Sequence, residues 1–439
     1  MNDRLSQLYP AHLQTLKQRH DRALSETGYD AAIVFAGTTR MAFLDDMPLA
    51  FKPNPHFKAW APILDNPNCF VVYTPGQKPR LIYFQPVDYW YKPAETPSGY
   101  WVDHFDIRII TSPEEAKQHL PRNGRSAFIG EPEGDFAGDL NPAPLLNRLH
   151  FDRTWKTEYE IECMRRANKI GARAHRAAEH AFRNGASEYE IHLEFLRAAN
   201  STEEELPYAN IIGMNENAAV LHYMQHDRRH VEEPRRFSFL IDAGASVNGY
   251  AADITRTYSQ RNDEFGRMIQ ALDAGQQKLC AAVKPKVNYP DLHAQAHRMI
   301  AGVLKDFHFT KDIDADGIVE KSISSTFFPH GVGHYIGLQV HDVAGFMADR
   351  TGTAMPRPER HPYLRLTRTV EPTHVFTIEP GMYFIAPLLS ELQKSGNAKY
   401  VNWGKVDDFR KFGGIRIEDD VVVTTSGHEN LTRAAFSET

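Results

Sequence analysis

The sequence predicts an α/β domain with a mixed sheet, followed by a larger α+β domain. Up to about residue 155, helical and extended patterns alternate, as they do where helices cover a sheet. From Thr157 onward, helices and strands come in groups rather than in strict alternation. We therefore expect domains over residues 1–155 and 156–439. The first has no phosphate-binding glycine loop and no cluster of ionisable groups, so we expect a scaffold, dimerisation element or pocket gate.

Composition is typical of a soluble globular protein. The 439 residues are 42% hydrophobic and 24% charged. The net charge of −6 argues against nucleic acid or an anionic membrane as the main partner. Cys69, Cys163 and Cys280 are far apart and show no CxxC spacing, which suits a reducing compartment. The N-terminus lacks the apolar segment of a secretory signal, so we expect a cytoplasmic protein.

The first domain is expected to begin with a helix and continue as a sheet. The helix should end near Gly28, and a hairpin should turn across Pro75-Gly76. A further helix is expected to open at Ser112-Pro113. The expected strands comprise residues 31–35, 69–73, 81–84, 107–110 and 126–129.

Two capping boxes predict where helices of the second domain begin. Thr157 and Ser187 are each followed three residues later by a glutamate that can reach back to the cap. Gly185 is suited to end the first of these helices. Further elements are expected as helices around 264–283 and 291–306, and as strands at 374–379 and 414–424.

The stretch 237–258 predicts two strands joined by a turn that contains Asn-Gly. A turn centred near Val247 and Asn248 places Asp242 directly opposite Asp253, with Cβ atoms about 4.5–5.5 Å apart. Two buried carboxylates this close repel each other unless a cation or a shared proton intervenes. The pair therefore suggests a metal clasp, although alone it also fits an aspartate that only caps the turn.

Three other segments offer partners for these aspartates. The loop 328–334 contains glycines and a proline that forbid a regular helix, and it presents His330 and His334. An apolar strand ends in Glu379, directly before a Pro-Gly turn. In segment 413–421, period-2 alternation puts three polar side chains on one face: Arg416, Glu418 and Asp420.

The combination resembles the M24 metallopeptidase family, whose catalytic domain has the pita-bread fold. All five family ligand positions are filled in order: Asp242 and Asp253 in IDAGASVNGYAAD, His334 in HGVGH, Glu379 in TIEPG and Glu418 in IRIED. In the first domain, FLDD (43–46), FKAW (57–60) and PVDYW (86–90) resemble the bacterial Xaa-Pro dipeptidases, or prolidases. Relatives of those enzymes include the organophosphorus acid anhydrolases.

The ligand set suits two divalent ions. Four carboxylates carry a charge that two such ions balance, and oxygen ligands with one imidazole favour Mn²⁺ or Co²⁺, with Zn²⁺ as an alternative. The resemblance favours Mn²⁺. It also implies that Asp253 and Glu418 bridge the ions, with Asp242 on one ion and His334 and Glu379 on the other. A hydroxide held between the ions would attack the substrate carbonyl.

The resemblance implies hydrolysis of Xaa-Pro dipeptides that have a free C-terminal carboxylate, with organophosphorus P–F and P–O bonds as side substrates. Glu379 would carry a proton, while His341 and His330 would orient the substrate and stabilise the tetrahedral state. Arg365 matches the family position that binds the carboxylate, and Arg416 is the alternative.

His222, Tyr208 and Asp46 complete the expected substrate site. The resemblance implies a homodimer in which Asp46 reaches into the partner's pocket and limits it to two residues. Two other functions stay open at this point. One is an Xaa-Pro aminopeptidase acting on longer peptides, and the other is a non-catalytic binding module with the same fold.

Overall fold

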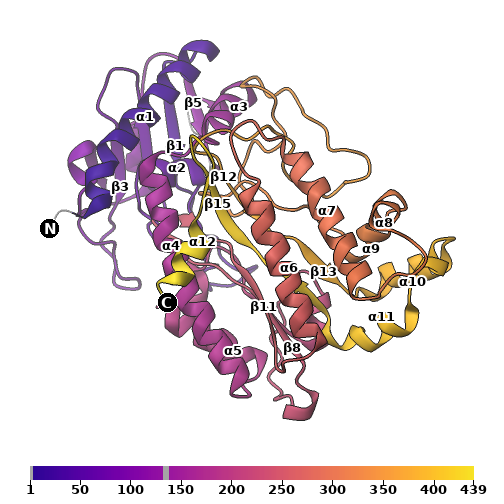
Figure 1. Ribbon diagram of the computed structural model, residues 1–439. Coiled ribbons are helices and arrows are strands. Elements are labelled where there is room, and N and C mark those ends of the chain that lie inside the picture. Colours follow the sequence, from indigo (N-terminus) through magenta and orange to yellow (C-terminus); the bar gives the residue numbers. More distant parts are fainter. Residues whose placement is uncertain (1–2, 132–137) are drawn as a thin grey trace. The chain divides into compact units, whose positions relative to one another are not determined.

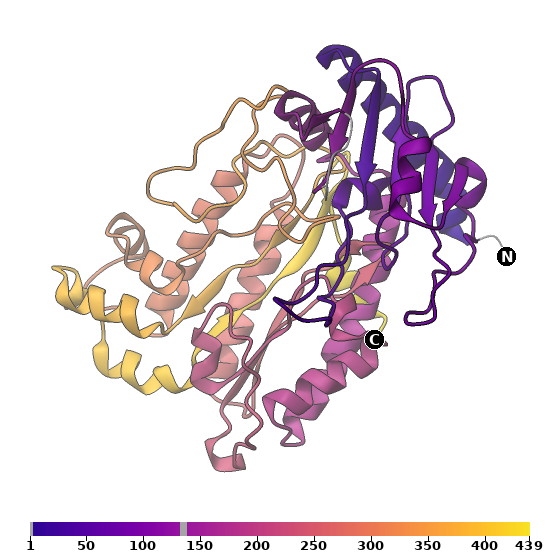
Figure 2. The ribbon, with the colours of Figure 1, turned by 180° about the vertical axis from the view of Figure 1, so that it is seen from behind.

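The computed structural model describes residues 3–131 and 138–439, and it divides into two compact units (Figures 1 and 2). The first unit comprises Met1–Cys163 with two short segments, Val247–Tyr250 and Met347–Thr353. The second unit comprises Met164–Ser246, Ala251–Phe346 and Ala354–Thr439. The main division of the chain falls inside helix α4 (Glu158–Arg183).

The described part of the first unit contains a mixed sheet, as predicted. Its strands are β1 (Ala31–Phe35), β2 (Phe70–Tyr73), β3 (Arg80–Phe84), β4 (Asp106–Ile110), β5 (Ser126–Ile129) and β6 (Asp139–Leu140). Their order is β4-β3-β2-β1-β5-β6. The pairs β1–β2 and β2–β3 are antiparallel, whereas β3–β4, β1–β5 and β5–β6 are parallel. Every residue of β1 is buried, which is typical of a central strand covered on both faces.

The remaining elements of this unit are helices α1 (Arg4–Thr27), α2 (Pro55–Trp60) and α3 (Ala143–Asp152), with 3₁₀ turns η1 (Val102–His104) and η2 (Pro113–Gln118). Helix α1 ends at Gly28, whose φ of 72° is the left-handed cap that the sequence predicts. The helix expected after Ser112 is instead the 3₁₀ turn η2. It is only six residues long, and short pieces favour the tighter i→i+3 pattern.

From α4 onward the chain is α+β. Its later helices are α5 (Glu188–Ala199), α6 (Glu264–Ala281), α7 (Tyr289–Asp306), α8 (Ala315–Glu320), α9 (Ile323–Phe327), α10 (Ala386–Lys394), α11 (Trp403–Phe409) and α12 (Leu431–Ser437). Its 3₁₀ turns are η3 (Glu203–Glu205), η4 (Asn215–Ala219), η5 (Glu233–Arg235), η6 (Ala398–Tyr400) and η7 (Arg410–Phe412). Its strands are β7 (Ile211–Met214), β8 (Ser238–Asp242), β9 (Ser246–Val247), β10 (Tyr250–Ala251), β11 (Thr255–Ser259), β12 (Val375–Ile378), β13 (Gly381–Tyr383), β14 (Gly414–Arg416), β15 (Asp419–Val423) and β16 (His428–Asn430).

Both capping boxes are present. Thr157 accepts from the Glu160 backbone N–H at 3.4 Å and donates its own N–H to the Glu160 carboxylate at 2.7 Å. Ser187 exchanges the corresponding pair with Glu190. Each reciprocal pair satisfies orphan N–H groups at a helix start, so a four-residue pattern is enough to locate it.

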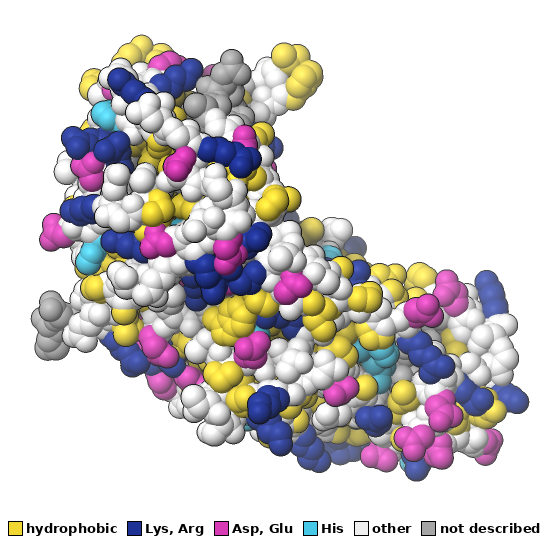
Figure 3. Space-filling model, turned by 90° about the horizontal axis from the view of Figure 1, so that it is seen from above, with side chains coloured by type: hydrophobic (Ala, Val, Ile, Leu, Met, Phe, Trp, Pro, Cys, Tyr) yellow, Lys and Arg dark blue, Asp and Glu magenta, His cyan; other side chains and the backbone are white. Residues whose placement is uncertain are grey.

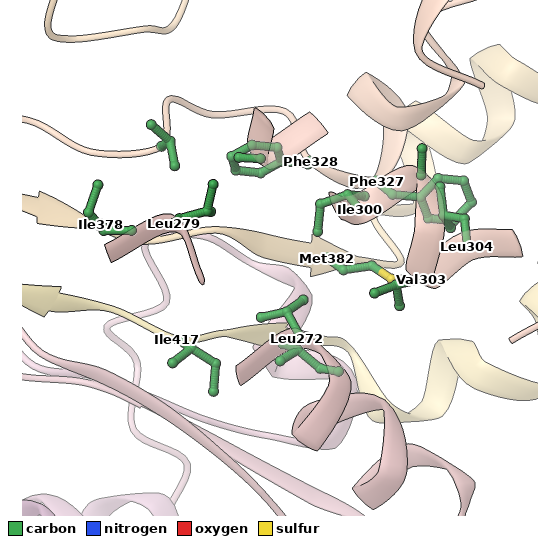
Figure 4. Close-up of a cluster of buried hydrophobic side chains, with 14 of the residues drawn as sticks. Leu272, Leu279, Ile300, Val303, Leu304, Phe327, Phe328, Ile378, Met382 and Ile417 are labelled. Atoms are coloured by element: carbon green, nitrogen blue, oxygen red, sulfur yellow. The ribbon is translucent and has the colours of Figure 1, made fainter. Parts of the chain in front are cut away.

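The small sheets β12-β15-β16 and β13-β14 of the second unit lie against one large apolar core. Another sheet, ordered β11-β8-β7, packs against α4 and α5 in a separate apolar cluster. Figure 4 shows side chains of the large core converging from α6 and α7 on one hand and from β12 and β13 on the other. The side chains labelled there are Leu272, Leu279, Ile300, Val303, Leu304, Phe327, Phe328, Ile378, Met382 and Ile417. The packing holds the strand ends that carry the polar groups described below.

The register of the predicted hairpin differs by two residues from the expected one. Asp242 pairs with Thr255, not with Asp253. The turn centres on Asn248 and Gly249, because both adopt positive φ, 53° and 84°. Side chains alternate between the two faces of a strand, so a register shift of two residues leaves each side chain on its original face. Asp242 and Asp253 therefore remain diagonal neighbours on one side of the sheet.

On the face seen in Figure 3, basic and acidic side chains are interspersed. Among the described residues, no helix combines the length and apolar composition that crossing a membrane requires.

Candidate metal centre

Asp242 and Asp253 are brought together beneath one tyrosine. Asp242 ends β8, and Asp253 lies two residues before β11. The Tyr208 hydroxyl lies 2.8 Å from Oδ1 of Asp242 and 2.6 Å from Oδ1 of Asp253. Gly244 allows this approach, because a Cβ there would come within 2.9 Å of the Tyr208 ring. Both carboxylates thus point into the same buried pocket.

The glycine-rich loop delivers His334 to this pocket. The loop runs alongside β12 and its end, to which two backbone hydrogen bonds join it. Thr377 N–H donates to the His334 carbonyl at 2.9 Å, and Glu379 N–H donates to the Val332 carbonyl at 2.8 Å. Gly333, with φ 154°, permits the close approach, because a Cβ would run into the Thr377 carbonyl. His334 Nε2 lies 3.5 Å from Oδ2 of Asp253 and 3.6 Å from Oε1 of Glu379.

Glu418 completes the set from the gap between β14 and β15. Its N–H donates to the Thr255 carbonyl at 3.1 Å, and the Thr255 hydroxyl donates to its Oε2 at 2.7 Å. The predicted alternation is confirmed on both faces. Asp420 accepts the Asp253 backbone N–H at 3.1 Å, whereas Asp419 accepts from Arg256 on the other side.

Arg416 reaches the pocket from β14. Its Nη2 donates to Oδ2 of Asp242 at 2.6 Å, its Nη1 to the Tyr383 hydroxyl at 2.9 Å, and its Nε to Thr255 Oγ1 at 3.2 Å. The side chain is buried. All three nitrogens of the guanidinium are therefore used within the protein.

The donor set fits divalent metal ions. Ligand atoms of Asp253, His334 and Glu418 lie within 4.8 Å of one another, and all three residues are buried. Burial, followed by repulsion from neighbouring carboxylates, raises the pKa of Glu418 well above its usual value. Burial likewise raises the pKa of Glu379 to about 7. Such crowded, dehydrated carboxylates are stabilised by cations, and oxygen donors with one imidazole suit divalent ions.

Two further predicted residues border the pocket. His330 Nε2 lies 2.8 Å from the Tyr383 hydroxyl, and its Nδ1 lies 3.5 Å from Oε2 of Glu379. The His341 ring stands nearly perpendicular to that of His334, with centroids 4.3 Å apart. Burial, then the charge of His334, lowers the pKa of His341 to about 3.

His222 and Arg365 are exposed, and the charge of each influences the pKa of His341. Asp46 is an exposed residue of the first unit, and the Asp46 N–H donates to Oδ1 of Asp45 at 2.8 Å. The expected contribution of Asp46 to a partner's pocket stays a prediction.

Two supporting residues, Tyr383 and Asp420, were given no role in the site from the sequence. Tyr383 links His330 to Arg416 through its hydroxyl. Asp420 holds the backbone of Asp253, and Asn168 donates to the same Asp420 oxygen at 2.8 Å. The period-2 alternation of a strand puts Asp420 on the same face as Glu418, and this pattern is the sequence feature that indicates a place for Asp420 in the site.

Comparisons with known proteins agree with this architecture. Residues 7–151 match the family model described as Xaa-Pro dipeptidase, N-terminal domain, and residues 162–425 match metallopeptidase family M24. A Stenotrophomonas maltophilia protein named Xaa-Pro dipeptidase is 51% identical over 434 residues, 98% of this chain and 97% of the relative. A Shewanella oneidensis protein of the same name is 48% identical over 437 residues, 98% and 99%. Zinc-substituted Escherichia coli aminopeptidase P has a TM-score of 0.71 at 23% identity, over 96% of this chain and 95% of that one, which shows a shared fold.

The fold and the buried acidic pocket together define a metal-dependent hydrolase with a pita-bread catalytic domain. The chain belongs to metallopeptidase family M24, whose model covers residues 162–425. The interpretation as a non-catalytic binding module is therefore set aside.

Proposed function

We propose that this protein is an Xaa-Pro dipeptidase that hydrolyses dipeptides with a free C-terminal carboxylate. One observation carries the proposal. Five side chains of metal-ligand type converge in one buried pocket, in a chain 51% identical over nearly its full length to a protein named Xaa-Pro dipeptidase. The first domain, residues 1–155, would serve dimerisation and gating, and residues 156–439 the chemistry. We place the enzyme in the cytoplasm as a homodimer.

Two divalent ions, with Mn²⁺ favoured, would be held by the five predicted ligands: Asp242, Asp253, His334, Glu379 and Glu418. Asp253 and Glu418 are the proposed bridges, and the short separations among Asp253, His334 and Glu418 support this role. When bound, such ions supply Lewis acidity and lower the pKa of a water nucleophile.

Glu379 is proposed to move the proton. The bond before proline has no N–H, so its cleavage requires protonation of the ring nitrogen as it leaves. Oε2 of Glu379 lies 3.5 Å from His330 Nδ1, and Tyr383 holds the other nitrogen of that ring. Nδ1 of His330 lies closer to the Gly331 carbonyl, at 2.8 Å, so the imidazole is held in place beside the Glu379 carboxylate.

Arg365 and the two imidazoles on the open side are proposed to bind the substrate ends. Arg365 offers a planar fork to the C-terminal carboxylate. Because Arg416 is already paired with Asp242, Arg365 is the better of the two candidates. The charges of Arg365, His222 and Asp253 all influence the pKa of His341, which supports grouping these residues around one pocket. We propose that His341 stabilises the tetrahedral state and that His222 and Tyr208 line the substrate.

Peptide length tests the proposal. We expect purified protein with added Mn²⁺ to hydrolyse Gly-Pro and Leu-Pro and to leave Leu-Pro-Gly largely intact. Faster cleavage of Leu-Pro-Gly would establish an Xaa-Pro aminopeptidase instead. Failure to cleave any of the three at saturating metal would refute both.

We further propose a side activity on organophosphorus P–F and P–O bonds. A tetrahedral phosphorus centre resembles the tetrahedral state of the attacked carbonyl, so the same pocket can bind it. A fluoride-release assay with a phosphorofluoridate tests this. Release should depend on the same metal and stop in Glu418→Ala.

A further inference from the structure

Three histidines outside the acidic pocket form a second cluster. His293 and His297 are one turn apart on α7, and His361 lies in the segment 354–370, which contains no helix or strand among the described residues. One ring nitrogen of each lies within 4.8 Å of the other two. His293 and His297 are buried, and His361 is half-buried. None of them belongs to the proposed catalytic set.

The geometry of the cluster matches that of a metal site. The Nε2 atoms of His293 and His297 are 3.2 Å apart. A tetrahedral zinc ion with Zn–N bonds of about 2.0–2.1 Å separates its ligand nitrogens by about 3.4 Å. Histidines at i and i+4 present their rings on one helix face. The His361 ring centroid lies 4.3 Å from that of His293 and 4.8 Å from that of His297.

The imidazoles are also in the state that metal binding requires. Burial, then repulsion between the rings, lowers the pKa of His293 to about 2, and burial lowers that of His297 to about 4. The rings are therefore neutral near pH 7, and each neutral imidazole has one nitrogen lone pair that can bind a metal ion. His297 Nδ1 lies 3.0 Å from Ser324 Oγ, a contact of the kind that orients a metal ligand. Within the described residues, Nδ1 of His293 has no hydrogen-bond partner although the ring is 2% exposed.

We propose that His293, His297 and His361 bind a zinc-type transition metal ion that ties the segment 354–370 to helix α7. A site with imidazole ligands alone suits Zn²⁺, Cu²⁺ or Ni²⁺, whereas carboxylates suit Mn²⁺. The two sites of the chain would therefore select different metals. The half-buried position of His361 leaves solvent access for a fourth ligand, water.

We call the proposed metal site of His293, His297 and His361 the clip. Two observations connect the clip to the catalytic pocket. The Phe328 ring lies 5.6 Å from His293, 5.0 Å from His297 and 4.9 Å from His330, so it forms a wall shared by the cluster and the pocket. Arg365 follows four residues after His361 in the same segment. An ion in the clip would thus order the segment that carries Arg365. The role of Arg365 rests on the proposed function, but the existence of the clip does not.

Zinc content is the first test. Protein is equilibrated with Zn²⁺, freed of excess by gel filtration, and its zinc per chain is measured by mass spectrometry. Wild type should retain one zinc ion more than His361→Ala and one more than His293→Gln/His297→Gln. His361 lies on a loop, so its variant should fold normally, as circular dichroism can show. Equal zinc content in wild type and folded His361→Ala would overturn the proposal.

A matched control is a different pair of neighbouring histidines, His192 and His226, whose rings are stacked. The rings of His192 and His226 lie 4.4 Å apart, but their nitrogens contact Asn210, and the described residues place no third imidazole in a metal-ligand group with them. The variant His192→Gln/His226→Gln should keep the wild-type zinc content. A loss in this control equal to that in His361→Ala would show non-specific imidazole binding and overturn the proposal.

Proteolysis tests the clip without any peptidase assay. Arg360 is exposed, and the bond between Arg360 and His361 is open to trypsin. Zn²⁺ should slow this cleavage about tenfold in wild type, because binding favours the closed segment. Neither Mn²⁺ on wild type nor Zn²⁺ on His293→Gln/His297→Gln should give that protection. Equal cleavage rates with and without Zn²⁺ would refute the clip, whether or not the protein is a dipeptidase.

Discussion

Arg416 donates from Nη2 to Oδ2 of Asp242 over 2.6 Å, and both side chains are buried. This pair places a fixed positive charge beside a proposed metal ligand. It offsets part of the repulsion among the carboxylates of the pocket before any ion binds. The guanidinium of Arg416 is therefore already paired with groups of the pocket itself.

The first prediction concerns this pair. Arg416→Met should destabilise the chelated protein by about 3–5 kcal/mol, because it leaves the buried Asp242 carboxylate without its partner. With Mn²⁺ bound, the loss should be smaller, since the ions replace the missing charge. Urea unfolding in EDTA and in Mn²⁺ measures both. Arg410→Met, at an exposed pair with Asp407, should change little in either condition. Equal losses in EDTA and Mn²⁺ would contradict the assignment of Asp242 as a ligand.

The second prediction concerns the proposed bridges. Asp253→Ala and Glu418→Ala should each abolish hydrolysis and reduce bound Mn²⁺. The rise in melting temperature that Mn²⁺ gives wild type should shrink, because an ion that binds only the folded state stabilises it. Metal analysis and thermal unfolding check this. The exposed Glu391→Ala on α10 is the control. Near-normal turnover in either bridge variant would refute the two-ion assignment.

The third prediction concerns the substrate carboxylate. Arg365→Ala should raise KM for Leu-Pro strongly and change hydrolysis of an uncharged Leu-Pro ester little, because only the dipeptide has the group that Arg365 would bind. Steady-state kinetics on both substrates measures the difference. Arg360→Ala removes another exposed charge of the same segment and should affect neither. Equal losses on dipeptide and ester would assign the carboxylate to another residue.

Much of the architecture could be predicted because it rests on local rules. The caps at Thr157 and Ser187 and the stop at Gly28 each depend on a few adjacent residues. The face shared by Glu418 and Asp420 depends only on the period of a strand. Such features do not need knowledge of distant segments.

The register of the hairpin and the pairing of Arg416 could not be predicted, because both depend on where distant segments of the chain meet. Moving the turn centre by one residue moves the partner of Asp242 by two, and Val247-Asn248 and Asn248-Gly249 both suit a turn. The partner of Arg416 also depends on a distant segment. The alternation along β14 would be the same whether its arginine faced solvent or β8, where Asp242 lies. Sequence could therefore name Arg416 as a candidate but could not distinguish a substrate-binding role from its pairing with Asp242.

The fourth prediction concerns acid stability of the first unit. His20 on α1 is buried against Trp60, and burial lowers its pKa from 6.5 to about 4. As the pH falls, His20 therefore binds a proton in the unfolded chain before it does so in the folded one. The contribution of neutral His20 to the free energy of unfolding is present above pH 6.5 and is lost toward pH 4. Between pH 7.5 and 5 this amounts to about 2 kcal/mol. Urea unfolding in chelator should show a flatter pH dependence for His20→Leu, and no such change for the exposed His180→Leu. Equal slopes for both variants would contradict it.

The fifth prediction is that the protein is a homodimer in which Asp46 closes the partner's pocket. Phe43 and Leu44, directly before it, are 92% and 91% exposed, which is unusual for adjacent large apolar side chains and suits burial against a second copy. An acidic group at the pocket rim would attract the substrate's free amine while Arg365 holds the carboxylate, and so limit the substrate to two residues.

Sedimentation and kinetics test it together. Wild type should sediment as a dimer, and Phe43→Ser/Leu44→Ser should shift it toward monomer. Asp46→Ala should raise KM for Leu-Pro and speed cleavage of Leu-Pro-Gly, with Mn²⁺ content unchanged because no ligand is touched. Glu114→Ala, an exposed acidic residue on η2 of the same unit, should behave like wild type. A monomer with full dipeptidase activity would rule out any contribution of Asp46 across a subunit boundary.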